Sequence, residues 1–552
     1  MTALFFASVA AMAAAVIAAL ALRGKGRGPL YALMTGTFLA LALLLLALPG
    51  APLERLLKAV YGAAKALAFS NADLAALQER MAKGMPWVQT APSALRLWAQ
   101  SWAAALYLFA ALLSMQYVLS FIKKYGARLW YLLGFFSKRV FVFSSQCPQS
   151  EALAKSLRER LHARMAFFDP DVRLHMHRPG AEITLFAIGE DEPANVTQAL
   201  RWIEKYRYRN HTTVCVFSES VESELLLGAA MAPRQGRQPG ESFKVRRINP
   251  AQALVCRTLY APPAPLGDSI FGGAKDTGGE EKLICAVVFG LGRLGGEMAK
   301  ALCWFGQMDG YKLQVHAFEK DPEAVRRFSE SCPGLLEHRG KGGQGEDRYE
   351  LELYTDAAGF DAALRQIPAT YVFVALGGDG KNLDMALNLR VLFEREGHTP
   401  DILAVVRDPE KARRLREGPL VNFKGKSYDI TVVGSLEEQY AWETILDSEL
   451  EKEACRRHVS YAGNDKDFYR FEYNFRSSMA AAIHAEWRRR RNIHDDDAPE
   501  LEHRRWNAYM RGQGYVYDPE RNDRAKTHPD LVSFQALSDR EKEKDRAMTQ
   551  PR

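Results

Sequence analysis

The sequence lacks most of the patterns by which enzymes and metal proteins are identified. It contains no HExxH, no P-loop, no Ser/His/Asp order and no paired-carboxylate motif, and its seven cysteines are scattered without C-x-x-C spacing. No cysteine precedes Cys147, which is typical of reduced cytosolic thiols and not of a disulfide framework or a zinc site. The net charge of +7 is small for 552 residues and does not by itself indicate nucleic acid. We therefore expect no catalysis, no bound metal and no nucleic-acid partner.

Long uncharged runs are almost confined to the first 125 positions. Three of them, at 2–22, 30–48 and 97–122, are long enough for helices that cross a bilayer. The first has no basic residues before it, so it differs from a signal peptide and should be retained. The sequence thus predicts a transmembrane domain over 1–125, with the lipid bilayer as its partner.

Basic residues predict the orientation of these helices. The loop 23–28 carries three of them, and Lys123 and Lys124 follow the third run. Because short basic loops stay on the cytoplasmic side, the N-terminus and segment 51–95 should lie outside. Everything after about residue 123 should then be cytoplasmic, with the protein in the inner (plasma) membrane.

Segment 51–95 and the spans lack the marks of an ion path, since they carry no TVGYG-type filter and the spans hold no charged residue. Apolar residues such as Leu53, Leu56 and Leu57 recur at helical spacing, which indicates an amphipathic helix on the outer surface or a small packed cap. Small residues at helix-packing spacing favour association, so we expect a homo-oligomer. These residues are Ala7, Ala11, Ala14 and Ala18 in the first run and Gly36 and Ala40 in the second.

The stretch 283–303 has the pattern of a dinucleotide-binding turn. An apolar, β-rich run leads into Gly290-x-Gly292-x-x-Gly295 and then into a helical pattern. The first glycine allows the tight turn, the second lets a pyrophosphate approach the backbone, and the third lets the helix pack on the strand. The phosphate then lies at the positive N-terminus of that helix.

Residues that follow later strands would complete this site. The next predicted strand ends at Glu319, whose carboxylate would bind ribose hydroxyls and repel the extra phosphate of NADP. Asp356 and the loop Gly377-Gly378 also follow strands, where doubly wound sheets bind ligands. Asp356 would accept from adenine or ribose, or else cap a helix. The predicted cofactor is NAD or another adenine nucleotide, and the alternative is a glycine turn in a Rossmann fold that has lost its ligand.

Alternating strands and helices predict two α/β units in tandem, each with a mostly parallel sheet. The first covers 139–262, and its first turn, 144–148, reads SSQCP where a glycine fingerprint would lie. We therefore expect a degenerate, structural Rossmann-like unit there. The second covers 283–446 and follows a Pro- and Gly-rich linker at 262–281.

The motifs VVFGLGRLGGEMAKAL, VHAFEKD and YVFVALGGDGKNLDMALNLR of the second unit resemble those of the TrkA-N or RCK nucleotide-binding domains of potassium channels and transporters. The resemblance covers residues 139–440 and implies a regulatory ligand instead of a hydride donor. Arg293, in the glycine loop, is by position a phosphate-facing candidate.

The composition becomes charged and aromatic after about residue 448. Helical patterns at 475–491 and 500–511 precede a short strand, and Ser538 is expected to cap a last helix. The motifs E-H-x-R-W, G-Y, K-x-H-P-x-L-V and K-x-K-D-R resemble the RyR domain, the small helical repeat first named in ryanodine receptors and also found fused to bacterial TrkA-N proteins. We therefore assign 448–552 to an RyR domain.

This domain offers a second candidate ligand site. Trp506 and Tyr515, which stands where the family usually has a Trp, would stack on a base while Arg505, Lys526 and His528 hold phosphates. The alternative is that Trp506 belongs to the core and the charges form a solvated face. The complete predicted set is Glu502, His503, Arg505, Trp506, Tyr515, Lys526 and His528.

The predicted fold class is a membrane α-helical N-terminus with three spans, tandem α/β Rossmann-like units and a small, mainly α RyR domain. The predicted function is a membrane-anchored nucleotide sensor whose cytosolic domains control the transmembrane part, as a channel-like or membrane-disrupting effector. Bacterial proteins that combine spans, TrkA-N and RyR domains are similar to predicted effectors of nucleotide-signal conflict systems, so phage defence is a hypothesis from architecture. The alternatives are a regulatory subunit of potassium transport that senses NAD or ATP and a membrane-tethered scaffold.

Overall fold

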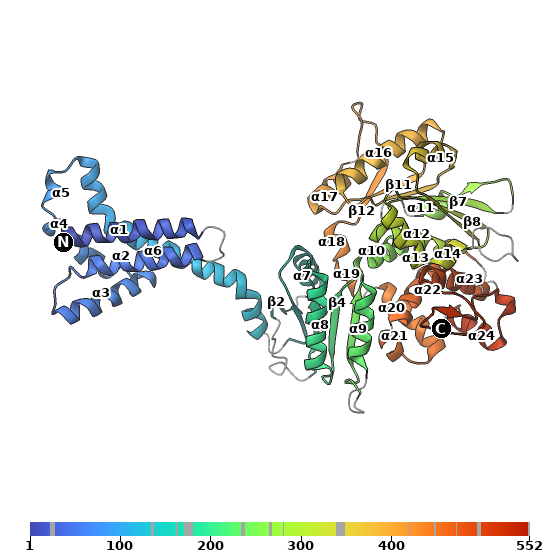
Figure 1. Ribbon diagram of the computed structural model, residues 1–552, viewed down its shortest axis with the longest axis horizontal. Helices are drawn as coiled ribbons and strands as arrows, with labels where there is room; N and C mark the ends of the chain where they lie inside the picture. Colours follow the sequence, from blue (N-terminus) through green and yellow to red (C-terminus); the bar gives the residue numbers. More distant parts are fainter. Residues whose placement is uncertain are drawn as a thin grey trace. The chain divides into compact units, whose positions relative to one another are not determined.

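The computed structural model forms two compact units, Met1–Trp130 and Tyr131–Arg552 (Figure 1). Each unit has hydrophobic clusters of its own. The described residues are 1–22, 28–133, 137–161, 164–169, 180–232, 238–263, 266, 268–279, 281–337, 348–418, 420–446, 449–470, 472–493 and 498–549.

Three helices of the N-terminal unit are long and apolar enough to cross a membrane, as predicted. They are α1 (Thr2–Ala21), α2 (Gly28–Leu45) and α6 (Ser93–Leu133), of which Ser93–Leu119 is the apolar part. The basic residues at 23–27 and the side chains of Lys123 and Lys124 lie outside the described part of the chain. The predicted orientation therefore stays a prediction.

Helices α1 and α2 pack closely through small residues. A Cβ atom on Gly36 would lie 2.0 Å from the Cβ of Ala15, so only glycine fits there. In the predicted small-residue stripe of α1, Ala7, Ala14 and Ala18 are exposed in the single chain, so their role in association between copies stays a prediction. The packed face of α1 is shifted by one position, and its small residues join helices within one chain.

Segment 51–95 folds into α3 (Pro52–Leu67), α4 (Leu74–Gly84) and α5 (Trp87–Thr90). The buried face of α3 consists of small residues such as Ala59 and Ala63, which allow close packing on α2. Leu77 of α4 is buried in the same hydrophobic cluster. The segment is thus a packed cap, and the leucine stripe of α3, including Leu53 and Leu57, is exposed on it.

The first α/β unit is a five-stranded parallel sheet with the strand order β2-β1-β3-β4-β5, which is a doubly wound arrangement. Only β2 was missed, because a strand of four residues is too short to show a period. The strands are β1 (Arg139–Phe143), β2 (Arg164–Phe167), β3 (Glu182–Ala187), β4 (Thr212–Phe217) and β5 (Phe243–Ile248). The helices are α7 (Pro148–Leu161), α8 (Glu192–Tyr206), α9 (Val221–Met231) and α10 (Pro250–Tyr260).

The second α/β unit has the order β12-β11-β10-β7-β8-β9, with β6 antiparallel to the start of β7. Read from β9, this is the Rossmann order 3-2-1-4-5-6, which places the ends of β7 and β10 at the switch point. The strands are β6 (Lys275–Asp276), β7 (Lys282–Phe289), β8 (Tyr311–Phe318), β9 (Tyr349–Tyr354), β10 (Tyr371–Val374), β11 (Asp401–Val405) and β12 (Ile430–Val433). The helices that matter below are α12 (Arg293–Phe305), α13 (Pro322–Ser331), α15 (Phe360–Gln366), α16 (Asp379–Arg395), α18 (Leu436–Gln439) and α19 (Trp442–Ile445).

The segment 262–281 is not a simple linker, which corrects our prediction. It contains α11 (Ser269–Gly272) as well as β6. Ile270 and Phe271 are 4% and 2% exposed and belong to the core of the second unit. These two apolar residues hold the segment against the core. They were missed because the prolines and glycines around them dominate the composition of the segment.

The C-terminal part is mainly helical, as predicted. It consists of α20 (Glu449–Ala462), α21 (Lys466–Arg470), α22 (Glu472–Arg490), α23 (Ala498–Gly512), a ribbon of β13 (Val516–Tyr517) with β14 (Thr527–His528), and α24 (Asp539–Thr549). Ser538 precedes α24, and its Oγ accepts from the Glu541 backbone N–H at 3.4 Å. This is the expected helix cap.

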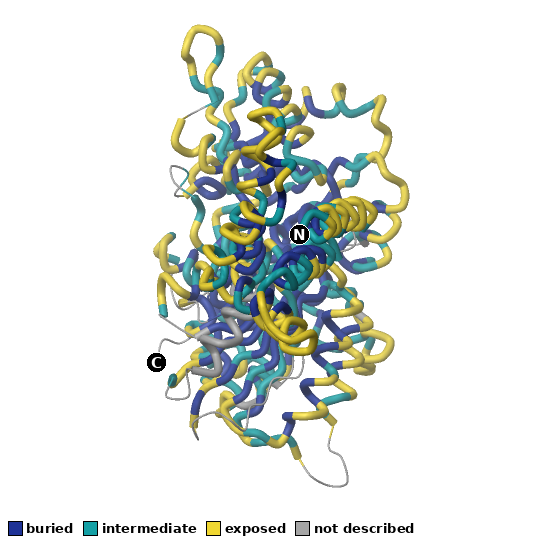
Figure 2. The backbone as a smooth tube through the Cα atoms, turned by 90° about the vertical axis from the view of Figure 1, so that its left-hand side faces the viewer, coloured by how far each residue is buried: buried dark blue, intermediate teal, exposed yellow. Residues whose placement is uncertain are grey.

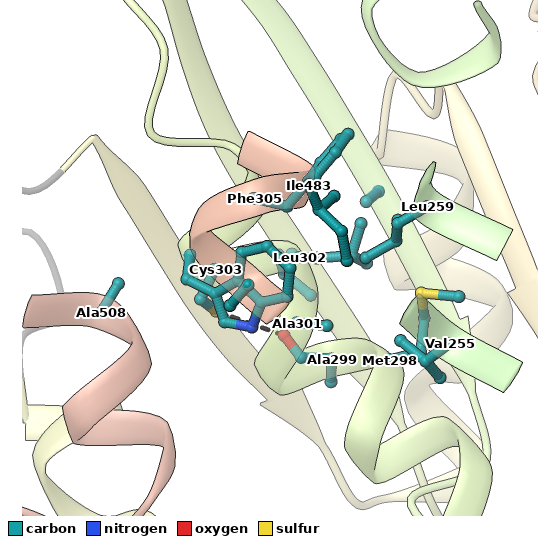
Figure 3. Close-up of a cluster of buried hydrophobic side chains, with 14 of the residues drawn as sticks. Val255, Leu259, Met298, Ala299, Ala301, Leu302, Cys303, Phe305, Ile483 and Ala508 are labelled. Atoms are coloured by element: carbon teal, nitrogen blue, oxygen red, sulfur yellow. Dashed lines mark hydrogen bonds between the residues drawn. The ribbon is translucent and has the colours of Figure 1, made fainter. Parts of the chain in front are cut away.

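Helix α12 is buried between the second sheet and the C-terminal helices. Met298 and Leu302 of α12 are fully buried, and Ile483 of α22 and Ala508 of α23 belong to the same hydrophobic cluster (Figure 3). Trp487 of α22 donates its indole N–H to the carbonyl oxygen of Leu259 on α10 at 2.8 Å. Figure 2 colours the backbone by burial, with the buried residues in dark blue. The C-terminal helices and the second unit therefore share one core.

The two α/β units exchange helices. Helix α10, which follows the last strand of the first unit, packs in the core of the second. In return, α18 and α19 contact α7 of the first unit, where the Trp442 N–H donates to Ser156 Oγ at 2.8 Å. Lys155 pairs with Glu437 at 2.7 Å across the same contact. Neither α/β unit is complete without an element of the other.

A pH dependence follows from His484, which is fully buried on α22 and donates from Nε2 to the carbonyl oxygen of Gln307 at 2.7 Å. Burial lowers the pKa of His484 well below its usual value. An unfolded histidine takes up a proton near pH 6.5, so stability should be complete above that pH and fall as the pH drops below it. We expect a lower melting temperature at about pH 5.5 than at about pH 7.5.

The control for this prediction is His484→Gln, which keeps a donor for Gln307 and cannot titrate. Its melting temperature should fall less on acidification than that of the wild type. Differential scanning calorimetry of the detergent-solubilised protein measures both, and equal losses would contradict the assignment to His484.

Candidate functional site

The first and third glycines of the turn after β7 are required by the fold itself. Gly290 has a φ of +91°, and a Cβ there would lie 2.5 Å from the carbonyl oxygen of Ala375, at the end of β10. A Cβ on Gly295 would lie 1.8 Å from the carbonyl oxygen of Gly290. One glycine thus makes the tight turn and the other lets α12 pack on it, which are the roles expected from the spacing.

The second glycine lies in a different environment. Gly292 is exposed, is the N-cap residue of α12, and has nothing within 4 Å of the position that a Cβ would take. The protein therefore does not need a glycine there for its own packing. An anion has open access to the start of α12, where backbone N–H groups and the helix dipole favour negative charge.

Glu319 lies at this turn. It follows β8, the neighbour of β7, and its Oε2 accepts from the Leu291 N–H at 2.8 Å. Its Oε1 accepts from the Asp321 N–H at 2.9 Å. The carboxylate is thus held beside the turn, where it was expected to bind ribose hydroxyls.

The other predicted residues of this site make no contact with the glycine turn itself that the structure describes. Asp356 accepts from the Ala358 N–H at 3.0 Å and caps the short 3-10 helix η2 (Ala357–Gly359), which is the helix-cap alternative. Gly377 has a φ of +88°, and Gly378 is the N-cap residue of α16, on the loop that follows β10. Because β10 ends against Gly290, this loop belongs to the same edge of the sheet as the turn.

Arg293 makes a contact that the sequence did not indicate. Its side chain is 74% exposed, and its Nε lies 3.1 Å from Oε2 of Glu219, a residue of the first α/β unit. Burial raises the pKa of Glu219, and the positive charge of Arg293 opposes that rise. Glu219 lies two residues after the end of β4, and its position near a strand end was the available signal.

The corresponding turn of the first unit is closed by its own side chains. Ser144 Oγ donates to the carbonyl oxygen of Ile188 at 3.0 Å, and the Ile188 N–H donates back to Ser144 Oγ at 2.9 Å. Ser145 Oγ bonds the same carbonyl. These bonds join the ends of β1 and β3 where a glycine turn would leave room for a phosphate. They support a structural role for this unit.

The C-terminal candidate residues lie mostly inside their domain. Glu502 and Arg505 are 2% and 0% exposed and form a buried ion pair at 2.7 Å. His503 is also buried, with Nε2 2.9 Å from the carbonyl oxygen of Val532 and Nδ1 3.2 Å from Asp545. The three side chains therefore stabilise the packing of α23 against its neighbours.

The aromatic candidates are closer to the surface. Trp506 is half-buried between the rings of His503 and His528, with centroid distances of 5.8 and 5.1 Å, and its indole N–H donates to the Tyr473 hydroxyl at 3.2 Å. Burial lowers the pKa of His528, and Asp530 opposes this.

Two further candidates lie near the β13–β14 ribbon. Lys526 is exposed and donates from Nζ to the carbonyl oxygen of Gln513 at 2.8 Å. Tyr515 is half-buried against the shared core. Burial raises its pKa.

Among the residues that the structure describes, no group of three or more His, Cys, Asp or Glu side chains is arranged to hold a metal ion. A narrow cavity lies between α10, α12, α22 and α23. Its lining includes Glu297, Lys300, Arg476 and Tyr509.

The RyR domain family model matches residues 488–551, so the chain carries an RyR domain at this end. The match begins near the end of α22 and leaves out α20 and α21, which we had assigned to the domain. No curated protein matches the sequence.

Three solved structures are similar to parts of the chain. A mutant of GsuK is 16% identical with a TM-score of 0.29 and covers 61% of this chain and 80% of its own. GsuK bound to ADP is 16% identical with a TM-score of 0.28 and covers 61% and 81%. The GsuK channel is 14% identical with a TM-score of 0.28 and covers 79% and 81%. At these values the likenesses support no conclusion about ligand or function.

Two glycine substitutions should separate folding from binding. Gly295→Ala places a methyl group on a backbone carbonyl, so it should lower the melting temperature strongly or prevent folding. Gly292→Ala adds a methyl group in open space at an N-cap position, where Ala is less favourable than Gly, so it should lower the melting temperature only slightly. If the turn binds a nucleotide, the same change should abolish the stabilisation by NAD. Thermal denaturation with and without NAD measures both effects. Full NAD stabilisation of Gly292→Ala would contradict the assigned role.

Trp506→Ala should destabilise the C-terminal domain, because it removes a ring packed between two imidazoles. A fully buried Trp→Ala change costs 3–5 kcal/mol, and for this half-buried ring we expect about 2 kcal/mol. Tyr517→Ala, at a 56% exposed aromatic residue nearby, should change stability by less than about 0.5 kcal/mol. Thermal denaturation distinguishes them; an unchanged melting temperature for Trp506→Ala with loss of nucleotide binding would instead make Trp506 a ligand contact.

Proposed function

We propose that this chain is a membrane-anchored sensor that binds an adenine nucleotide, such as NAD, at the glycine turn after β7. The observation that carries the proposal is the contrast within the turn: Gly290 and Gly295 are required by packing, whereas Gly292 opens to solvent at the start of α12. A glycine that the fold does not need fits a position kept small for a ligand. The carboxylate of Glu319 beside it suits ribose hydroxyls.

Helix α12 connects this site to the C-terminal domain. Helix α12 begins at the turn and packs with its whole length between the second sheet and α22 and α23. A ligand at its N-terminus therefore contacts the element on which the RyR domain rests. A sensor needs no bond to be made or broken; the ligand only has to favour one arrangement of these parts over another.

The N-terminal helices would give the output. We propose that the nucleotide-bound state makes them conduct ions or disrupt the membrane, and phage defence is one setting for such an effector. A regulator of potassium transport and a static scaffold are the competing functions. The three functions differ in when the membrane responds. An effector responds when an induced nucleotide binds, and a transport regulator responds at resting metabolite levels. A scaffold does not respond.

We expect NAD, NADH, ATP or ADP-ribose to raise the melting temperature of the full-length protein. A ligand at a hundred times its dissociation constant stabilises by about 2.7 kcal/mol. Glu319→Gln should weaken the binding by about tenfold, because a charged acceptor of ribose hydroxyls is lost. Asp361→Asn, which removes a charge from the exposed start of α15, should leave binding unchanged. Titration calorimetry measures these affinities.

Reconstitution of the full-length protein in liposomes tests whether the N-terminal helices respond to the nucleotide. A nucleotide-gated effector should release potassium or a fluorescent dye only after the nucleotide is added, and a transport regulator should alter potassium flux without it. If no nucleotide shifted the melting temperature and none changed the flux, the sensor proposal would be wrong and the scaffold would gain support.

A further inference from the structure

The glycine-turn site includes a residue of the other α/β unit. Glu219 lies two residues after the end of β4, at the carboxyl end of the first sheet, whereas Arg293 belongs to the second α/β unit. Its side chain is only 21% exposed, yet its Oε2 reaches the Nε of Arg293 at 3.1 Å. The guanidinium closest in sequence to the phosphate position is therefore already paired with a carboxylate.

The loop around Glu219 holds this carboxylate in place. Oε1 of Glu192 accepts from the Ser218 hydroxyl at 2.5 Å and from the backbone N–H groups of Glu219 and Ser220 at 3.0 and 2.8 Å. A second negative charge thus lies under the loop. Burial and the charge of Glu192 disfavour the ionised Glu219 carboxylate, whereas the positive charges of Arg293, which pairs with it, and of Arg407 favour it.

The same loop is tied to the C-terminal part of the chain. Arg247, whose side chain is 4% exposed, donates to the carbonyl oxygen of Ser220 at 2.7 Å and to Glu472 of α22 at 2.8 Å. Tyr473, the next residue, accepts from Trp506. A displacement of the Glu219 loop therefore acts on α22, whose Tyr473 contacts Trp506 of the second candidate site.

We propose that Glu219 is the resident counter-ion of the glycine-turn site and that the phosphate of an anionic ligand displaces it from Arg293. The inference rests on the proposed function and adds how the ligand is recognised: through a phosphate group, since a nucleoside without phosphate cannot compete for a guanidinium. When Arg293 turns to the phosphate, Glu219 is left beside Glu192 without its ion-pair partner. Ligand binding thus weakens the contact between the two α/β units.

Titration calorimetry with ADP-ribose on the full-length protein in detergent tests this exchange. Glu219→Gln should tighten binding by about fivefold, the worth of a partly exposed ion pair that no longer has to be broken. Arg293→Gln should weaken binding, and adding Glu219→Gln to it should bring no further gain. Glu222→Gln, the same change of charge at an exposed position of α9, should have no effect.

The outcomes separate the two proposals. If the wild type binds ADP-ribose and Glu219→Gln binds equally or more weakly, the counter-ion role is wrong and the proposed function stands. If Glu219→Gln tightened ADP-ribose binding equally in the wild type and in Arg293→Gln, the proposed exchange would also be wrong. The gain would then be a general effect of charge. No binding of ADP-ribose, NAD or ATP by the wild type would overturn both. If Glu219→Gln does not fold, Glu219→Asp, which keeps the charge and shortens its reach, should tighten binding in the same direction.

Discussion

The larger unit depends on the packing of helix α12 on both sides. Met298 and Leu302 are fully buried, with the second sheet on one side and the helices α22 and α23 on the other. Interiors packed at this density do not deform gradually, so α12 moves only together with the elements that enclose it. The glycine turn begins this helix. Binding energy gained there acts on the second unit and the C-terminal domain as one rigid body.

The first α/β unit is attached in a different way. Beyond the exchanged helices, its contacts with the C-terminal part include two ion pairs between largely buried side chains, Arg246 with Glu451 at 3.1 Å and Arg247 with Glu472 at 2.8 Å. Its contact with the glycine turn is the pair of Glu219 with Arg293. The pair of Glu219 with Arg293, whose side chain is 74% exposed, contributes little stability and is remade easily. Breaking either of the two buried pairs would leave a buried charge without its partner. Relative motion should therefore begin at the contact of Glu219 with the glycine turn.

The fold and the glycine turn were largely predictable because their signals are local. Periodicity placed most strands, and the spacing of Gly290 and Gly295 fixed their roles. Glu219 was not predictable, since it reaches the site from another domain through tertiary packing. The C-terminal motif identified its domain but not the placement of Glu502 and Arg505; their i, i+3 spacing on a helix was the signal for a mutual ion pair.

The free energy of exchanging Glu219 for a phosphate is too small to switch the protein by itself. Exchanging Glu219 for a phosphate on Arg293 involves about 1 kcal/mol, which changes the ratio of two states about fivefold. Moving an equilibrium from 1:99 to 99:1 takes about 5.5 kcal/mol. A switch built on this exchange therefore needs further differential contacts, from the ribose at Glu319 or from the loop that Asp379 joins to Arg407 and Asp408. Otherwise several copies must respond together, so that small contributions at each turn add up at one set of membrane helices.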